Sequence, residues 1–202
     1  MCNLGGMAYK LMHIEALELP GVVLMTPRRH GDDRGFFSEV FRDDVAAAFA
    51  PGLRFVQDNH AYSAQRGVLR GLHYQTPPHA QGKLVRCTRG AILDVAVDIR
   101  VGSPTFGKHV AAEISAANWR QIFVPPGFAH GYVTLEPETE VLYKVTDYYA
   151  PECDRGLAWD DPALAIDWGV DPAELVLSAK DRTHPRLAEA PAAFSWTGDA
   201  EV

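Results

Sequence analysis

The chain has 202 residues, of which 47% are hydrophobic and 22% charged, and its formal net charge is -7. Because one all-β domain of about 200–250 residues is common, this length predicts a single domain over residues 1–202. The acidic balance argues against a nucleic-acid partner, since binding to a phosphate backbone normally requires a basic face. No apolar run approaches the roughly 18 residues of a membrane span, so no membrane partner is expected.

The N-terminus and the cysteines indicate a cytoplasmic location. Residues 1–7 have neither a basic leader nor a long apolar stretch, so no secretory signal is expected. Cys2, Cys87 and Cys153 are odd in number, widely spaced and without a CxxC pair. This spacing argues against both a disulfide framework and a zinc cluster.

Short β-like runs alternate with turns rich in Gly and Pro along most of the chain. The clearest run covers residues 91–99, where the odd positions are apolar while Asp94 and Asp98 lie on the other face, which predicts a strand with one buried side. In chain order, strands are predicted at residues 22–25, 36–41, 84–88, 91–99, 110–114, 121–124 and 141–148. Helix is expected only at residues 43–49 and, as a single turn, at 172–175.

Many short strands at close spacing favour a mainly β fold, either a barrel or a sandwich. No internal repeat or linker interrupts the chain. The segment from Pro185 onward is rich in Ala and Pro and is expected to be irregular.

The densest polar cluster lies between residues 57 and 83 and carries too much charge for a plain core strand. Within it, Gly71 separates Arg70 from His73, and a glycine inside a strand permits a close approach of backbone or ligand. From this spacing alone, a hydrogen-bonded structural role for His73 is slightly favoured over a chemical one.

Two further residues stand where strands could present them to a cavity. His130 follows a tight Pro-Gly turn at the start of a strand, and Tyr143 alternates with Val141 and Val145 and therefore points inward. A buried tyrosine hydroxyl needs a hydrogen-bond partner. A structural role is the commoner one for each residue, so the residues alone leave both interpretations open.

Eight histidines in a β fold raise the hypothesis of a metal-dependent cupin. Its closely spaced ligands are missing, because His73 and His79 are separated by Pro77-Pro78 and there is no HxH pair. No metal is therefore predicted. Neither GxGxxG nor a P-loop occurs, and no elbow motif supports a serine triad.

A series of motifs resembles the dTDP-4-dehydrorhamnose 3,5-epimerase family and covers about residues 20 to 185 in family order. The motifs are DRGFFSE at 33–39, QDNH at 57–60, GVLRGLHYQ at 67–75, QGKLVR at 81–86, PPGFAHG at 125–131, LYK at 142–144, YYAP at 148–151, WDDP at 159–162 and LSAKD at 177–181. The resemblance implies a cupin-like β jelly roll that forms a homodimer and works without metal or organic cofactor. Its core would cover about residues 20–185, followed by an irregular tail at 186–202.

The activity that the resemblance implies is epimerisation of a dTDP-4-keto-6-deoxyhexose at C3 and C5, on the path to rhamnose-type deoxysugars. His73 would be the base, since an ordinary histidine pKa of about 6.5 leaves it neutral yet basic near pH 7. Asp181 would orient His73, and Lys83 would stabilise the oxyanion that forms beside the ketone. Tyr143 would be the acid on the opposite face of the sugar.

The resemblance also assigns a substrate-binding role to a larger set, in which arginines suit the diphosphate and aromatic rings suit the thymine. The set comprises Arg34, Phe37, Glu39, Gln57, Asp58, Asn59, Arg70, His130, Tyr149, Asp154 and Lys180. Asp154 stands where the family usually has Glu, so its side chain is one methylene shorter. Its contact with the substrate is expected to be lost or bridged by water.

Three alternatives remain open at this point. A relative that epimerises only C3 or only C5 for an antibiotic sugar would carry the same catalytic set. A non-catalytic cupin that binds a nucleotide sugar would need no proton donor opposite a base. A metal-dependent oxygenase or isomerase would lose its activity on chelation, and no such loss is expected.

Overall fold

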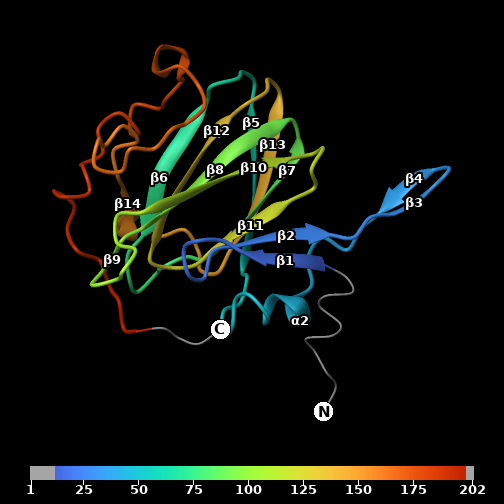
Figure 1. Ribbon diagram of the computed structural model, residues 1–202, viewed down its shortest axis with the longest axis horizontal. Coiled ribbons are helices and arrows are strands. Elements are labelled where there is room, and N and C mark those ends of the chain that lie inside the picture. The colour runs from blue at the N-terminus through green and yellow to red at the C-terminus, as the bar shows by residue number, and fades with distance from the viewer. Residues whose placement is uncertain (1–11, 199–202) are drawn as a thin grey trace.

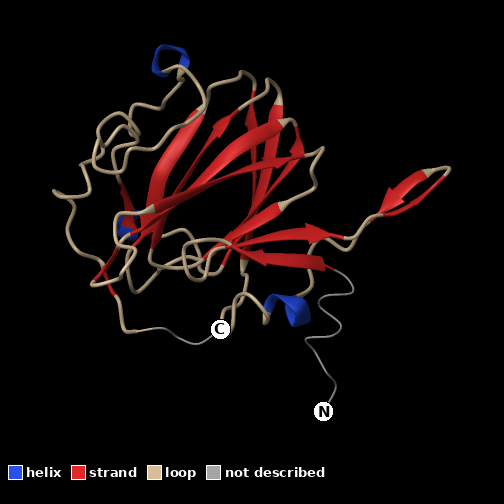
Figure 2. Ribbon diagram, in the orientation of Figure 1, coloured by secondary structure: helices blue, strands red, loops and turns tan. Residues whose placement is uncertain are grey.

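Two antiparallel β-sheets face each other in the computed structural model, which describes residues 12–198 (Figure 1). Strands form the body of the molecule, and the helices are few and short (Figure 2). The expectations for residues 1–7, for Cys2 and for the last residues of the tail, 199–202, lie outside the described residues. Among the residues that the structure does describe, no helix is long and apolar enough to cross a membrane.

The larger sheet has six strands, and strands distant in the sequence lie side by side in it. In spatial order they are β1 (Met12–Ala16), β2 (Val23–Pro27), β11 (Gln121–Val124), β7 (Lys83–Arg89), β13 (Thr139–Val145) and β5 (Gln57–Ser63). The facing sheet has five strands, in the order β10 (His109–Ser115), β8 (Ala91–Asp98), β12 (Phe128–Thr134), β6 (Leu69–Gln75) and β14 (Asp154–Gly156).

The remaining elements lie outside these two sheets. A hairpin of β3 (His30–Asp32) and β4 (Gly35–Phe37) projects away from the body (Figure 1). The short strands β9 (Arg100–Val101) and β15 (Phe194–Ser195) pair in parallel. The helices are α2 (Asp43–Ala46) and the 3-10 turns η1 (Pro151–Cys153) and η2 (Pro172–Glu174).

The mainly β prediction is confirmed, but the ends of some elements differ from expectation. The strands predicted at 84–88, 110–114 and 121–124 correspond to β7, β10 and β11. The strand predicted at 36–41 is wrong beyond Phe37, where β4 ends and the chain leaves the hairpin. Phe41 instead packs on Phe55, with the ring centroids 5.4 Å apart. The predicted helix and the last predicted strand are each shorter, ending at Ala46 and Val145.

Strand β8 corrects the expectation of a single buried side. Ile92 and Ala96 point into the core between the sheets, whereas Val95 and Val97 point to a second apolar cluster on the outer face of the five-stranded sheet. The C-terminal part of the chain folds back over this outer face and covers it (Figure 1). Asp94 and Asp98 alternate with these outer positions and therefore lie on the inner face, where both are 0% exposed and both carboxylates need partners inside the protein.

Asp98 obtains its partners at the end of β8. Its carboxylate accepts two hydrogen bonds from the Arg100 guanidinium, at 2.9 and 2.7 Å, and one each from the hydroxyls of Ser103 and Thr105. The same guanidinium lies 4.3 Å from the ring centroid of Trp196. The described part of the tail, which was expected to be irregular, is therefore held by the pairing of β15 with β9 and by the contact of Trp196 with Arg100.

Gly71 brings β6 close to β12, which is the close approach that a glycine inside a strand permits. Its φ is +142°, and a Cβ atom at this position would lie 2.5 Å from Cα of Gly131. The pairing of the two strands shifts register between His130 and Tyr132, as in a β-bulge. Because His73 is two residues beyond Gly71, this close approach fixes the position from which its side chain enters the interior.

Candidate active site

A cavity of about 280 Å³ lies between the two sheets and contains all four residues expected to be catalytic. His73 comes from β6 of the five-stranded sheet, while Lys83 and Tyr143 come from β7 and β13 of the facing sheet. Asp181 lies in the loop after η2. The other lining residues are Ala61, Arg70, His130, Tyr132, Ser178 and Lys180. The fold thus brings together groups that lie far apart in the sequence.

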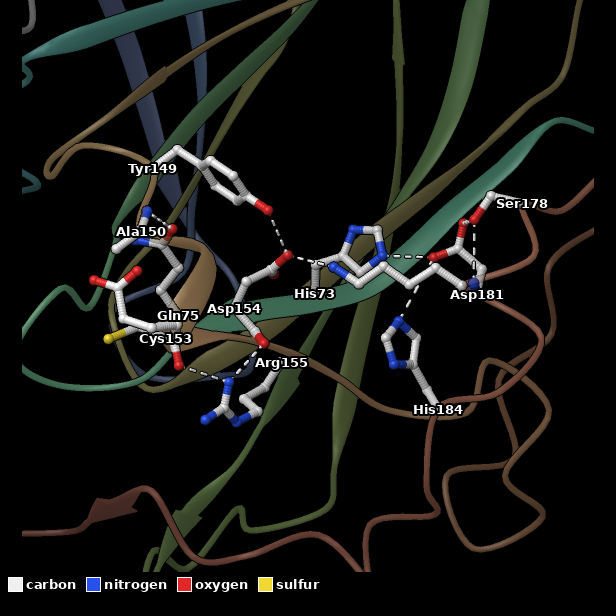
Figure 3. A network of polar contacts seen from close by, with 12 residues as sticks. His73, Gln75, Tyr149, Ala150, Cys153, Asp154, Arg155, Ser178, Asp181 and His184 are labelled. Atoms are coloured by element: carbon white, nitrogen blue, oxygen red, sulfur yellow. Dashed lines mark hydrogen bonds and ion pairs between the residues drawn. The ribbon is translucent and has the colours of Figure 1, made fainter.

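The carboxylate of Asp181 holds the His73 imidazole in place, with 2.5 Å between Oδ1 and Nε2 (Figure 3). The Ser178 hydroxyl donates to Oδ2 at 2.7 Å. Burial raises the pKa of Asp181, but the hydrogen bonds from His73 and Ser178 outweigh burial and hold this pKa below its usual value. A charged Asp181 accepts the Nε2 proton and leaves Nδ1 of His73 as the basic nitrogen.

A second histidine lies beside this pair. The rings of His184 and His73 are 5.5 Å apart, and Nε2 of His184 is 3.7 Å from Oδ1 of Asp181, so the three residues have the composition of a metal site. Ligand atoms about 2 Å from a tetrahedral zinc ion would lie roughly 3.3 Å apart. The direct contact of 2.5 Å between His73 and Asp181 fits a hydrogen bond better than joint coordination. The absence of a metal stays a prediction.

Lys83 and Tyr143 supply a cation and a phenol opposite the histidine. Nζ of Lys83 donates to the backbone carbonyl of His73 at 3.3 Å. Burial lowers the pKa of Lys83 to about 8, against the opposing effect of Asp154 and Asp94. Burial raises the pKa of Tyr143, so its phenol keeps its proton at neutral pH. The cavity therefore combines a base, a cation and a proton donor.

His130 also reaches the cavity, but a buried carboxylate holds it. Its Nε2 lies 3.0 and 2.9 Å from the two carboxylate oxygens of Asp94. Loss of either partner would leave the other buried and unpaired, which costs about 1–3 kcal/mol. The pair therefore supports the cavity wall that His130 forms.

Asp154 and Tyr149 lie beside His73 (Figure 3) and form a polar rim together with Lys180. Lys180 makes an ion pair with Asp154, and the Tyr149 hydroxyl donates to Oδ2 of Asp154 at 3.0 Å. Although it is one methylene shorter than Glu, Asp154 reaches both neighbours. Its contact with a substrate stays a prediction.

Gln57, Asn59 and Arg70 continue the site along its edges. The Gln57 amide donates to Oδ1 of Asn59 at 2.8 Å, and Asn59 lies opposite Tyr143 in the pairing of β5 with β13. Arg70 lines the cavity from β6, directly opposite Tyr132 on β12. These positions are compatible with the binding roles expected of them.

Among the expected binding residues, Arg70, His130 and Lys180 line this cavity, whereas the following four lie away from it within one chain. Arg34 lies at the tip of the hairpin, where its side chain is 90% exposed and pairs with Asp32, and Phe37 is 67% exposed. Glu39 and Asp58 line a separate hollow of about 410 Å³ that is also bounded by Phe41. This hollow is the larger of the two but does not contain His73 or Asp181.

Sequence reasoning missed several residues of the site. Ser178 lies within the LSAKD motif, and Asp94 lies within a strand pattern that sets it apart from the apolar positions, but neither pattern predicts the contacts of these residues. Tyr132 could have been found because it is two residues from His130 on one strand and therefore shares its face. Nothing in the local sequence indicates that His184 lies beside His73.

Comparison with known proteins places this site in a family. The family model described as dTDP-4-dehydrorhamnose 3,5-epimerase matches residues 16–189. A dTDP-4-dehydrorhamnose 3,5-epimerase of Sinorhizobium fredii is 52% identical over 193 residues, which cover 96% of this chain and 98% of the relative.

Solved structures agree with this match. The crystal structure of dTDP-6-deoxy-D-glucose-3,5-epimerase from Legionella pneumophila, in complex with dTDP-4-keto-L-rhamnose, is similar with a TM-score of 0.89 and 42% identity, covering 93% of this chain and all of that one. ChmJ, a 3'-monoepimerase from Streptomyces bikiniensis in complex with dTDP-quinovose, is also similar. The TM-score is 0.79 and the identity 36%, and the match covers 86% of this chain and 87% of ChmJ. These matches confirm the cupin-like jelly roll. The chain belongs to the dTDP-4-dehydrorhamnose 3,5-epimerase family of isomerases.

Proposed function

We propose that the cavity binds a dTDP-4-keto-6-deoxyhexose and epimerises it at both C3 and C5, in the formation of rhamnose-type deoxysugars. The observation that carries the proposal is the division of proton-transfer groups between the sheets, with His73 on one and Tyr143 on the other. Inversion of a carbon requires removal of a proton from one side and its return from the opposite side. A base and an acid on facing walls meet that requirement.

The first step is removal of the proton on a carbon next to the C4 ketone. Nδ1 of His73 takes this proton, and the electron pair of the broken C–H bond moves into an enolate whose charge lies on the ketone oxygen. Asp181 keeps the ring oriented and stabilises the imidazolium, as the carboxylate of a catalytic triad does. Ser178 in turn orients Asp181.

The second step returns a proton to the other face of the same carbon. The ammonium group of Lys83 stabilises the enolate while it exists, and this stabilisation is large because Lys83 is buried. Tyr143 donates its phenolic proton to the carbon, and the ketone forms again. Solvent then takes the proton from His73 and restores the one on Tyr143, so the same groups can serve the second carbon.

The closest alternative is epimerisation at one carbon only. Similarity to a 3'-monoepimerase supports it, because that relative has the same fold at 36% identity. The base, cation and phenol would be the same for one carbon or for two, so the number of carbons labelled by solvent must distinguish the two activities.

We also propose that the protein acts as a homodimer in the cytoplasm. The projecting hairpin supports the dimer, because Arg34 and Phe37 are strongly exposed and lie away from the cavity of their own chain. In a dimer, each hairpin would bring these residues to the cavity of the partner. The cytoplasmic location agrees with the free thiols of Cys87 and Cys153.

Deuterated water tests the reaction directly. Incubation of the protein with dTDP-4-keto-6-deoxyglucose should place deuterium at both C3 and C5, as measured by NMR. The variant His73→Ala should exchange about 10²- to 10⁴-fold more slowly because it has no base.

Label at only one carbon would support the monoepimerase instead, and binding without any exchange would support a non-catalytic cupin. A sample treated with EDTA serves as a further arm, in which exchange should continue at the untreated rate. Loss of exchange on chelation would contradict the prediction of a metal-free reaction.

The pH dependence tests the role of Lys83. The charged ammonium is present below its pKa of about 8 and is lost as the pH rises through this value, so the initial rate should fall on the alkaline side. The variant Lys83→Arg keeps its charge at high pH, since the pKa of arginine is above about 12. The rate of this variant should be lower than that of the wild type, but it should not fall as the pH rises through about 8. If the same alkaline fall remains, a group other than Lys83 causes it.

Mixed dimers test whether two chains build one site. The variants His73→Ala and Arg34→Ala should each be inactive or weak as homodimers. After they are mixed and allowed to exchange subunits, half of the dimers would be mixed and each would contain one intact site, so roughly a quarter of the wild-type activity should return. No recovery, with subunit exchange confirmed by mass spectrometry, would place Arg34 outside the partner's site.

A further inference from the structure

Tyr132 is a residue of the cavity wall whose buried hydroxyl none of the roles above uses. Tyr132 lies on β12 between Asp94 of β8 and Arg70 of β6, in cross-strand register with both. Its ring packs into the core between the sheets, and the residue is only 5% exposed. The residue also lines the cavity that contains His73 and Tyr143.

This hydroxyl has no hydrogen-bond partner among the described residues, although it is buried. A buried hydroxyl without a partner destabilises the folded state, which is why such groups are rare in proteins. Two neighbouring polar groups have other partners: Nε2 of His130 pairs with the Asp94 carboxylate, and the Arg70 guanidinium donates to the backbone carbonyl of Tyr62. A molecule that enters the cavity can therefore supply what the protein does not.

The Tyr132 hydroxyl is suited to donate rather than to lose its proton. Burial raises its pKa, and the nearby Tyr143 and Asp94 act in the same direction against the opposing effect of Arg70. A protonated phenol bonds well to an oxygen acceptor, such as a ketone, a ring oxygen or a hydroxyl of a sugar.

We infer that the Tyr132 hydroxyl donates a hydrogen bond to an oxygen of the sugar in the bound nucleotide sugar. The inference rests on the proposed function, because His73 and Tyr143 can exchange protons with a sugar only if its ring lies between them. Tyr132 lines that same space, on the sheet that carries His73. It is thus a contact to the sugar and not to the nucleotide, which extends away from the reacting carbons.

The substitution Tyr132→Phe tests this inference because it removes the hydroxyl and keeps the ring. Affinities for dTDP-glucose and for dTDP alone are measured by calorimetry, and KM for the 4-keto sugar by kinetics. The variant should bind dTDP-glucose about 3- to 10-fold more weakly and bind dTDP as the wild type does. Its KM should rise by a similar factor.

The variant Tyr74→Phe is the matched control, because Tyr74 is equally buried but belongs to the cluster on the outer face of the five-stranded sheet. It should leave both affinities unchanged. Thermal unfolding of each variant gives an independent measurement: Tyr132→Phe should not lower the unfolding temperature, since the lost hydroxyl has no partner among residues 12–198.

Three results would overturn the inference. They are an unchanged affinity of Tyr132→Phe for dTDP-glucose, an equal loss for dTDP and dTDP-glucose, and a lowered unfolding temperature, which would show that the hydroxyl has a structural bond. Failure of the proposed function looks different. In that case the wild type would exchange no deuterium at C3 or C5, whatever the affinities of the Tyr132 variant.

Discussion

The separation of His73 and Tyr143 onto two facing sheets is the constraint on which the proposed chemistry depends. A sandwich has two inner walls, and side chains that alternate along its strands point at each other across the space between them. A base on one wall and a phenol on the other can therefore act on opposite faces of one sugar ring. Close packing of β6 on β12 at Gly71 sets where the base enters this space.

Buried carboxylates hold the polar groups of the cavity in position. Asp181 orients His73, and Asp94 does the same for His130, so each histidine has a defined ring orientation. Both carboxylates are nearly inaccessible to water, and each is compensated by hydrogen bonds inside the protein. Within the described part of the chain no carboxylate hydrogen-bonds Lys83 in this way, and its lowered pKa follows from burial. That burial is also what would make its charge effective beside an enolate.

Much of the fold could be predicted from the sequence wherever alternation of apolar and polar residues controls burial. Strand β11 was predicted with both its ends, and the inward direction of Tyr143 follows from its alternation with Val141. The pattern failed where a strand has an unusual environment. Strand β8 is covered on both sides, so Asp94 is buried despite its charge, and β5 is polar because it borders the cavity.

Local sequence patterns predict the candidate site less well than they predict the fold. The spacing of the residues around His73 slightly favours a structural histidine. Its proposed role as the base follows from the resemblance of the surrounding motifs to the epimerase family. His73 is held by Asp181, which Ser178 holds in turn, and both residues are more than a hundred positions away. No local pattern reports such contacts, nor the buried hydroxyl of Tyr132, because both depend on how distant segments pack together.

The variant Tyr143→Phe in deuterated water tests the two-wall account most directly. It keeps the base and the cation but removes the acid from the opposite wall. The account predicts that His73 still exchanges protons, so deuterium enters the recovered substrate with its configuration unchanged, while little epimerised sugar forms. Epimerisation of the labelled sugar at the wild-type rate would contradict it.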